Sequence, residues 1–154
     1  MWKNLAVDDW STISLHDCRV TAISEQKNNI ILLFGDDGYW IIETNKLNPH
    51  NKTLRTDNSQ LTFVKGNCSR VLVENTALDG KLAVWHEVSW KEFCQNINSK
   101  KWSFEIVREF YAYSKECIYQ GYLYSDEAPV ACQLEFEFEK TLYEWNKIRE
   151  DRAW

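Results

Sequence analysis

The sequence predicts a mainly β protein, with an antiparallel sheet curled into a barrel or folded into a sandwich and one or two short helices. Apolar and polar residues alternate with a period of two along much of the chain, which is typical of half-buried strands. The alternating segments are short, and most are separated by hairpin-length turns. Aromatic residues make up 14% of the chain, whereas Gly and Pro number 5 and 2, which excludes a collagen-like or largely disordered protein.

The length of 154 residues predicts one domain, spanning 1–154. We find no internal repeat and no linker-like stretch that would divide the chain. A chain of this size buries enough surface to fold without a metal or disulfide.

The N-terminal half predicts a meander of three strands, at 18–24, 30–34 and 39–43. A polar stretch separates the first two strands, and the cluster Gly-Asp-Asp-Gly precedes the third. The polar stretch 44–59 is expected to be a long exposed loop.

A second hairpin is predicted from 61–65 and 70–74, joined across a Gly-Asn pair. Residues 75–81 are expected to form a turn and 82–88 another strand.

One helix is predicted over 90–97. Ser89 and Glu92 have the spacing of a capping box, and Val88 and Phe93 that of a hydrophobic staple. The apolar residues of this segment share one helical face: Trp90, Phe93, Cys94 and Ile97.

The C-terminal part of the chain predicts three further strands, at 102–113, 116–124 and 130–138. From Leu142 onward the pattern allows either a terminal helix or another strand, because apolar residues there suit both periods.

The net charge of −5 and the pI near 5.2 argue against nucleic acid and anionic membrane surfaces as partners, and permit a basic protein partner. No stretch has the length of a membrane span, and the first residues do not resemble a signal peptide, so we expect a cytoplasmic protein. The five cysteines include no CxxC and are expected to be buried thiols.

The chain has no phosphate-binding glycine loop, no nucleophile elbow and no zinc-protease motif, so we expect no enzyme, no cofactor and no metal. The pair His16-Asp17 is the core of one metal-dependent phosphohydrolase motif, but the further ligands of that motif are missing. His50 and His86 stand at no ligand spacing from it. A strand would place Cys18 and His16 on one face, as a Cys-His nucleophile pair requires, although a structural cysteine is the simpler interpretation.

The segment 133–139 alternates most clearly. One strand face would carry Leu134, Phe136 and Phe138, and the other Glu135, Glu137 and Glu139. Such an acidic stripe is either a solvated outer face or a docking surface for a basic protein. Asp126 and Glu127 precede it in the sequence and would add to the same negative surface.

Aromatic residues are concentrated in 110–124, and in 110–113 they occupy both faces of a strand. One set is expected in the core. The other set would be either partly exposed, as interface anchors are, or buried on the second face of a sandwich.

Two stretches carry a resemblance to a known group: LHDCRV at 15–20 with the following IILLFGDDGYWII, and the later W-x-x-F-C-x-x-I-N-S-x-x-W. They are similar to patterns in small bacterial proteins that resemble cytosolic immunity proteins of contact-dependent or polymorphic toxin systems. This resemblance implies a small, acidic, single-domain protein without catalytic motifs. It assigns no functional residues.

The first functional hypothesis is therefore a non-catalytic binding protein that blocks a basic toxin. The contacts would be Glu135, Glu137, Glu139, Asp126 and Glu127, with carboxylates in place of the phosphates of a nucleic-acid substrate. The alternatives are a small-ligand binder or enzyme with a site in a barrel mouth near His16, and a self-associating subunit. The sequence leaves the oligomeric state open.

Overall fold

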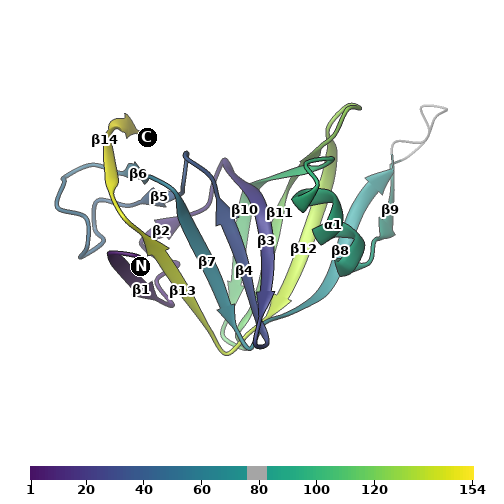
Figure 1. Cartoon of the computed structure of the whole chain (residues 1–154), viewed down its shortest axis with the longest axis horizontal. Coiled ribbons are helices and arrows are strands. Elements are labelled where there is room, and N and C mark those ends of the chain that lie inside the picture. The colour runs from purple at the N-terminus through teal and green to yellow at the C-terminus, as the bar shows by residue number, and fades with distance from the viewer. Residues whose placement is uncertain (76–82) are drawn as a thin grey trace.

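A computed structural model describes residues 1–75 and 83–154, which form two antiparallel sheets and one short helix (Figure 1). The larger sheet has ten strands in the order β1-β13-β7-β4-β3-β10-β11-β12-β8-β9. These strands are β1 (Asn4–Val7), β3 (Cys18–Gln26), β4 (Asn29–Phe34), β7 (Ser59–Val64), β8 (Asn67–Asn75), β9 (Val84–Glu87), β10 (Ser103–Ala112), β11 (Glu116–Tyr124), β12 (Val130–Glu137) and β13 (Lys140–Trp145). The smaller sheet has the order β14-β6-β5-β2, from β2 (Ile13–Ser14), β5 (Trp40–Ile41), β6 (Leu54–Thr56) and β14 (Ile148–Ala153).

The large sheet is strongly curled. Its strands converge at one end and spread apart at the other (Figure 1). β7 and β8 follow one another in the chain, yet five strands lie between them in the sheet, so the sheet must fold back on itself. Within the described residues the sheet stays open, because β1 and β9 each pair with one strand only. The predicted mainly antiparallel β class is thus confirmed, whereas neither sheet closes into a barrel.

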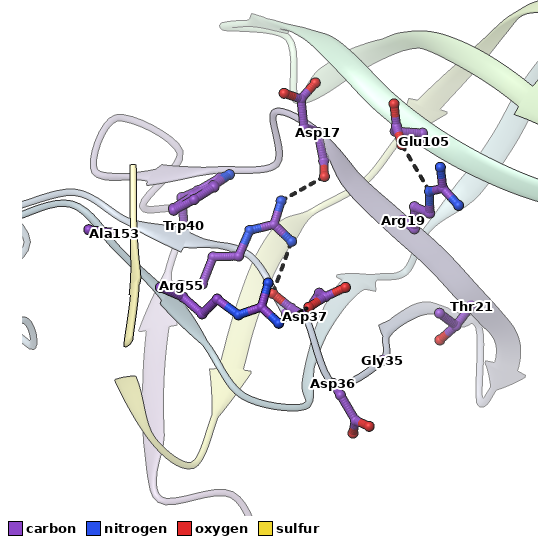
Figure 2. A pocket seen from close by; sticks show the side chains of 12 residues that line it. Asp17, Arg19, Thr21, Gly35, Asp36, Asp37, Trp40, Arg55, Glu105 and Ala153 are labelled. Carbon is purple, nitrogen blue, oxygen red and sulfur yellow. Dashed lines mark hydrogen bonds and ion pairs between the residues drawn. The ribbon is translucent and has the colours of Figure 1, made fainter. Parts of the chain in front are cut away.

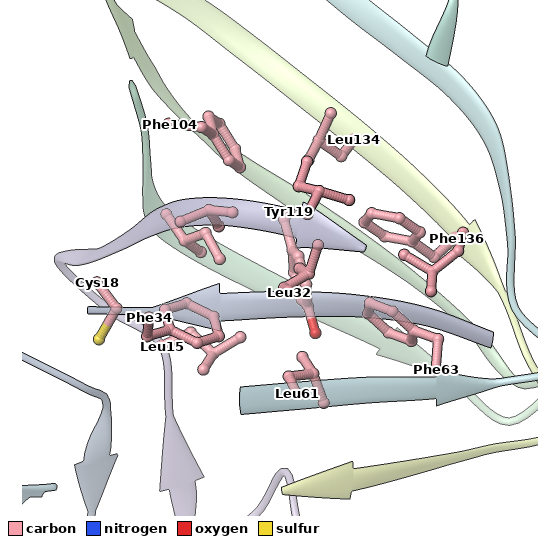
Figure 3. Close-up of a cluster of buried hydrophobic side chains, with 14 of the residues drawn as sticks. Leu15, Cys18, Leu32, Phe34, Leu61, Phe63, Phe104, Tyr119, Leu134 and Phe136 are labelled. Carbon is pink, nitrogen blue, oxygen red and sulfur yellow. The ribbon is translucent and has the colours of Figure 1, made fainter. Parts of the chain in front are cut away.

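The core lies between the two halves of the curl (Figure 3). Phe63 of β7 stacks on Phe136 of β12 with ring centroids 4.5 Å apart, which joins the halves near the narrow end. Leu32, Tyr119 and Leu134 are fully buried in the same cluster. Each comes from a period-2 strand, so alternate side chains reach the interior.

The helix α1 (Trp90–Asn98) is confirmed within one residue of its predicted end. Its capping interaction forms, because the Ser89 hydroxyl accepts the Glu92 N–H at 3.2 Å. Phe93 and Ile97 are fully buried, and α1 packs against β3 and β8, which belong to opposite halves of the curl. The helix thus bridges the two halves toward the spread end of the sheet (Figure 1). No helical segment described here has the length and hydrophobicity that a bilayer crossing needs.

The predicted three-stranded meander is wrong at its third strand. β3 and β4 pair, but the following segment leaves the large sheet, and β5 pairs with β2 and β6. Gly38 permits this departure, since it has φ 51° and a Cβ there would lie 2.1 Å from the Thr56 hydroxyl.

The predicted loop 44–59 contains β6 and the first residue of β7, so that prediction is wrong in part. Most of its residues before β6 are exposed, as predicted, but the side chains of Asn45 and Asn48 are buried and anchor this stretch. The Asn48 amide donates to the carbonyls of Ile41 and Lys52 at 3.1 and 3.0 Å. Hydrogen bonds of this kind, from side chain to backbone, take the place of hydrogen bonds between strands. They leave no periodic pattern of apolar residues in the sequence, so they could not be predicted from it.

The predicted hairpin of 61–65 with 70–74 is also wrong. β7 pairs with β4 and β13, and β8 pairs with β12 and β9. The residues after Leu142 form strands instead of a helix, and β1 and β2 were not predicted at all. The predicted turn at 75–81 lies, except for its first residue, outside the described residues, as does the start of the strand predicted at 82–88.

Candidate functional site

A β-bulge at Val107 decides which side chains of β10 face outward. The pairing of β10 with β11 shifts between Ile106 and Arg108. Before the shift Ile106 points inward; after it Glu109 points inward, and Arg108 and Phe110 point outward.

Gly121 of β11 makes this bulge possible. A Cβ at that position would lie 1.8 Å from the Glu105 carbonyl oxygen. Any other residue would therefore push the two strands apart.

The outward positions of β10, β11, β12, β8 and β9 form a continuous surface, which we call the outer face. Cross-strand neighbours follow from the pairing of these strands. The face has four rows of neighbouring residues. The first row is Glu105–Tyr122–Ala131 on β10, β11 and β12, followed by Glu74–Trp85 on β8 and β9, and the second is Arg108–Gln120–Gln133–Leu72–Glu87. The third row is Phe110–Ile118–Glu135–Arg70, and the fourth is Ala112–Glu116–Glu137.

Three large aromatic side chains of the outer face are about half exposed. The exposed fractions are 46% for Trp85, 48% for Phe110 and 47% for Tyr122. They come from three different strands, so their proximity is a property of the sheet and not of one sequence segment. Half-exposed aromatic rings on a pre-formed surface are typical anchors of protein interfaces.

The charge of the outer face is negative. Glu105 pairs with Arg19 at 2.9 Å and Glu135 with Arg70 at 3.8 Å. Among the described residues, four other glutamates of this face form no ion pair: Glu74, Glu87, Glu116 and Glu137. Arg108 is the one cation of the face that forms no ion pair with the described residues.

The five carboxylates singled out from the sequence do not form one patch. Glu135 and Glu137 lie on the outer face, and Glu139 lies just beyond β12, paired with Lys65 at 2.6 Å. Asp126 and Glu127 are exposed in the loop before β12. Because β12 rises about 3.4 Å per residue, they are separated from Glu137 by roughly 24 Å of strand.

Trp85 was not predicted as a member of the site. The sequence pattern predicted aromatic residues on both faces of the strand that is β10, but which set is exposed depends on the bulge at Val107. Trp85 and Tyr122 come together only through the pairing of β9 with β8 and of β8 with β12, which no local signal indicates.

His16 lies in the turn before β3. Its Nδ1 is 2.7 Å from the Val107 carbonyl oxygen, and its ring stacks on Trp154 with centroids 5.4 Å apart. Cys18 is fully buried, and burial raises the pKa of its thiol to about 12. The predicted shared face of His16 and Cys18 is wrong, because the strand begins only at Cys18 and the alternation does not reach back to His16.

A cleft of about 500 Å³ lies beside this turn, where the two sheets meet (Figure 2). Asp17 lines it, together with Trp40 and three arginines. Arg19 pairs with Glu105, and Arg152 lies 3.8 Å from Asp37.

Arg55 is held by the protein's own groups in this cleft. It donates to the carbonyl of Asp17 at 2.7 Å and lies over the Trp40 ring at 4.4 Å from the centroid. The positive groups of the cleft are thus largely satisfied from within, which leaves little attraction for an anion.

The remaining histidines stand apart from His16. His86 faces inward on β9, opposite Val73, and its Nδ1 has no hydrogen-bond partner in the described structure. His50 lies 3.9 Å from Glu150. The described residues contain no group of three His, Cys, Asp or Glu side chains arranged to hold a metal ion.

One buried polar cluster lies on the inner side of the bulge. Tyr111 donates its hydroxyl hydrogen to Glu109 at 2.8 Å, and its oxygen lies 3.2 Å from the hydroxyl of Tyr119 and 3.3 Å from that of Tyr143. Burial raises the pKa of Glu109 although three hydrogen-bond donors oppose that effect. This cluster ties strands of the curl together and is not open to a partner.

No family model matches the chain, and neither a curated protein nor a solved structure shows significant similarity to it.

Proposed function

We propose that this chain is a non-catalytic cytoplasmic domain that binds a basic protein on its outer face. One observation carries the proposal. Trp85, Phe110 and Tyr122 are about half exposed on one side of a five-stranded surface, and the charges of that surface that form no ion pair with the described residues are mostly glutamates.

The two kinds of side chain act at different stages of binding. Unpaired carboxylates attract a basic surface from a distance, which raises the association rate and disfavours acidic competitors. The aromatic rings then lose their remaining water contact against the partner, which slows dissociation.

The resemblance to immunity proteins suggests the kind of partner. A toxin that cleaves nucleic acid needs a basic surface to hold phosphates, and a glutamate-rich face can occupy that surface instead. Glu137 is the first contact we propose among the five predicted carboxylates, because it is exposed and forms no ion pair with the described residues. Glu135 and Glu139 would first have to leave Arg70 and Lys65, whereas Asp126 and Glu127 extend the negative surface beyond the Tyr122 end of the face.

Selection from a display library of fragments of the source genome tests this proposal. The immobilised chain is compared with a triple variant, Trp85→Ala, Phe110→Ala and Tyr122→Ala. We expect enriched fragments that are more basic than the library and that the triple variant does not retain. The matched control is Leu5→Ala with Val7→Ala, which removes two half-exposed apolar side chains at the opposite edge of the same sheet.

Two outcomes overturn the proposal: fragments that bind the triple variant as well as the native chain, or enriched fragments that are not basic. Enrichment of fragments from the chain's own gene would indicate self-association on this face instead.

A second candidate function is supported by the cleft beside His16. Its volume of about 500 Å³ and its Trp40–Arg55 pair are suited to a small planar ligand. A metabolite that raises the melting temperature of the native chain but not of Arg55→Ala, with no binder found by display, would favour this function over protein binding.

A further inference from the structure

The outer face contains a hollow of about 290 Å³ between Trp85 and Tyr122. Its floor includes Ala131, whose side chain is too small to fill the space between the two rings, and Arg108 and Gln120 line its far end on β10 and β11. The hollow exists because β12 places a small residue in the row that carries the two largest exposed side chains of the face.

The described residues that line the hollow include no carboxylate, but each of its two rings has one as its cross-strand neighbour. Glu74 stands opposite Trp85, and Glu105 stands opposite Tyr122. Glu105 is already engaged with Arg19. Glu74 is not: it accepts only the Ala131 N–H, at 3.4 Å and through one oxygen, among the described groups.

The protein already holds one of its own arginines with this combination of an aromatic ring and a carboxylate, and a second arginine against an aromatic ring alone. The Arg19 guanidinium lies 4.6 Å from the centroid of the Tyr124 ring while it pairs with Glu105. The Arg55 guanidinium lies 4.4 Å from the centroid of Trp40. In the described structure, no cation lies over Trp85.

We propose that this hollow is a subsite for an arginine side chain of the partner, which packs between Trp85 and Tyr122 and places its guanidinium over Trp85, paired to Glu74 beside the hollow. This proposal rests on the proposed function and names the chemistry of one anchor within it. Guanidinium is favoured over ammonium because it is planar, stacks on aromatic faces and offers a fork of donors to one carboxylate. Arg108 repels a cation at the β10 end of the hollow and so directs it toward Glu74.

A titration with short peptides, followed by backbone and indole N–H resonances, tests the subsite. The probe is acetyl-Gly-Arg-Gly-amide, and its control is the citrulline peptide, which has nearly the same shape but no charge. We expect the arginine peptide to shift the Trp85 indole signal and the amides of Glu74 and Ala131. The citrulline peptide should bind about fivefold more weakly or less.

Two protein variants make the test specific. Glu74→Gln should weaken the arginine peptide about fivefold while leaving the fold intact, because this side chain is on the surface. Glu116→Gln removes the same charge at the far end of the same face and should leave the affinity unchanged.

The subsite is overturned if arginine and citrulline peptides bind equally, if Glu116→Gln weakens binding as much as Glu74→Gln, or if the largest shifts fall in the cleft around Arg55. These results would not contradict the display selection, which tests the outer face separately. If basic fragments still required the aromatic rings, the outer face would remain the docking surface, but without an arginine anchor in this hollow.

Discussion

The Glu109 carboxylate accepts the backbone N–H of Leu15 at 2.8 Å, although these residues are 94 positions apart in the chain. The same oxygen lies 3.2 Å from the Ser14 hydroxyl, and the other oxygen accepts from Tyr111. One side chain thereby connects the small sheet, through β2, to the interior of the large one. Only the bulge at Val107 turns Glu109 inward, so the feature that shapes the outer face also creates this internal connection.

Glu109→Ala should lower the free energy of unfolding by about 3 kcal/mol, because it leaves the Leu15 N–H and the Tyr111 hydroxyl without their acceptor. Glu109→Gln keeps an acceptor oxygen and should lose less than half as much. Urea unfolding of the two variants measures the difference. Equal losses would show that the negative charge, and not the hydrogen bonds, matters at this position.

The stability of the native chain should respond to pH through Glu109. Burial raises the pKa of this carboxyl above its ordinary value of 4.5, so the folded state binds the proton more tightly than the unfolded state. The favourable contribution is present below pH 4.5 and is lost as pH rises through the folded pKa. Unfolding curves between pH 4 and pH 7 should therefore be less pH-dependent for Glu109→Gln; an unchanged difference across this range would contradict the assignment.

Asp8 should have the opposite pH dependence. Burial opposes its ionisation, but hydrogen bonds from Thr141 and Lys115 outweigh that effect and hold its pKa below the ordinary value of 3.8. Its contribution is present above pH 3.8 and is lost as pH falls through the folded pKa. Asp8→Asn should lower the free energy of unfolding at pH 7 by about 1–2 kcal/mol and reduce the acid sensitivity below pH 4. Asp36→Asn, which removes an exposed carboxylate, is the control and should change neither.

Gly121→Ala should destabilise the fold by about 3 kcal/mol or more, because the added methyl group collides with the Glu105 carbonyl oxygen and displaces β10. Gly35→Ala is the matched control. Its added Cβ would meet the Thr21 methyl carbon at 3.2 Å, an end that can move, so we expect a change below about 1 kcal/mol. Thermal unfolding distinguishes the two variants. A normal melting temperature for Gly121→Ala would show that the bulge tolerates a side chain.

Charge reversal at Glu137 should slow association with the basic fragments about tenfold at low salt, since this carboxylate forms no ion pair with the described residues. The dissociation rate should change little, because the residue lies away from the aromatic rings. Asp36→Lys changes the charge by the same amount beside the cleft where the two sheets meet, and should leave the association rate within about twofold. Rates that are independent of salt for all of these proteins would contradict electrostatic steering.

The sequence by itself determined the mainly β fold class, the positions of most strands and the helix. β11 spans the predicted residues, and α1 ends one residue later than predicted. Both could be predicted because the alternation of a strand and the capping pair of a helix involve only residues close together in the sequence. The same locality explains why Leu134 and Phe136 are in the core as the alternation predicts.

Tertiary structure alone decided which strands pair and which side chains meet. β5 can leave the large sheet because Gly38 lies in close contact with Thr56, and Phe110 points outward because of a bulge opposite Gly121. The five acidic residues chosen from the sequence are close in the chain, but they are spread from the loop before β12 to the turn after it, whereas Trp85 and Tyr122 are far apart in the chain and line one hollow. Strand pairing is non-local, so the free energy that selects it comes from burying side chains of distant segments together, and no window of the sequence contains that information.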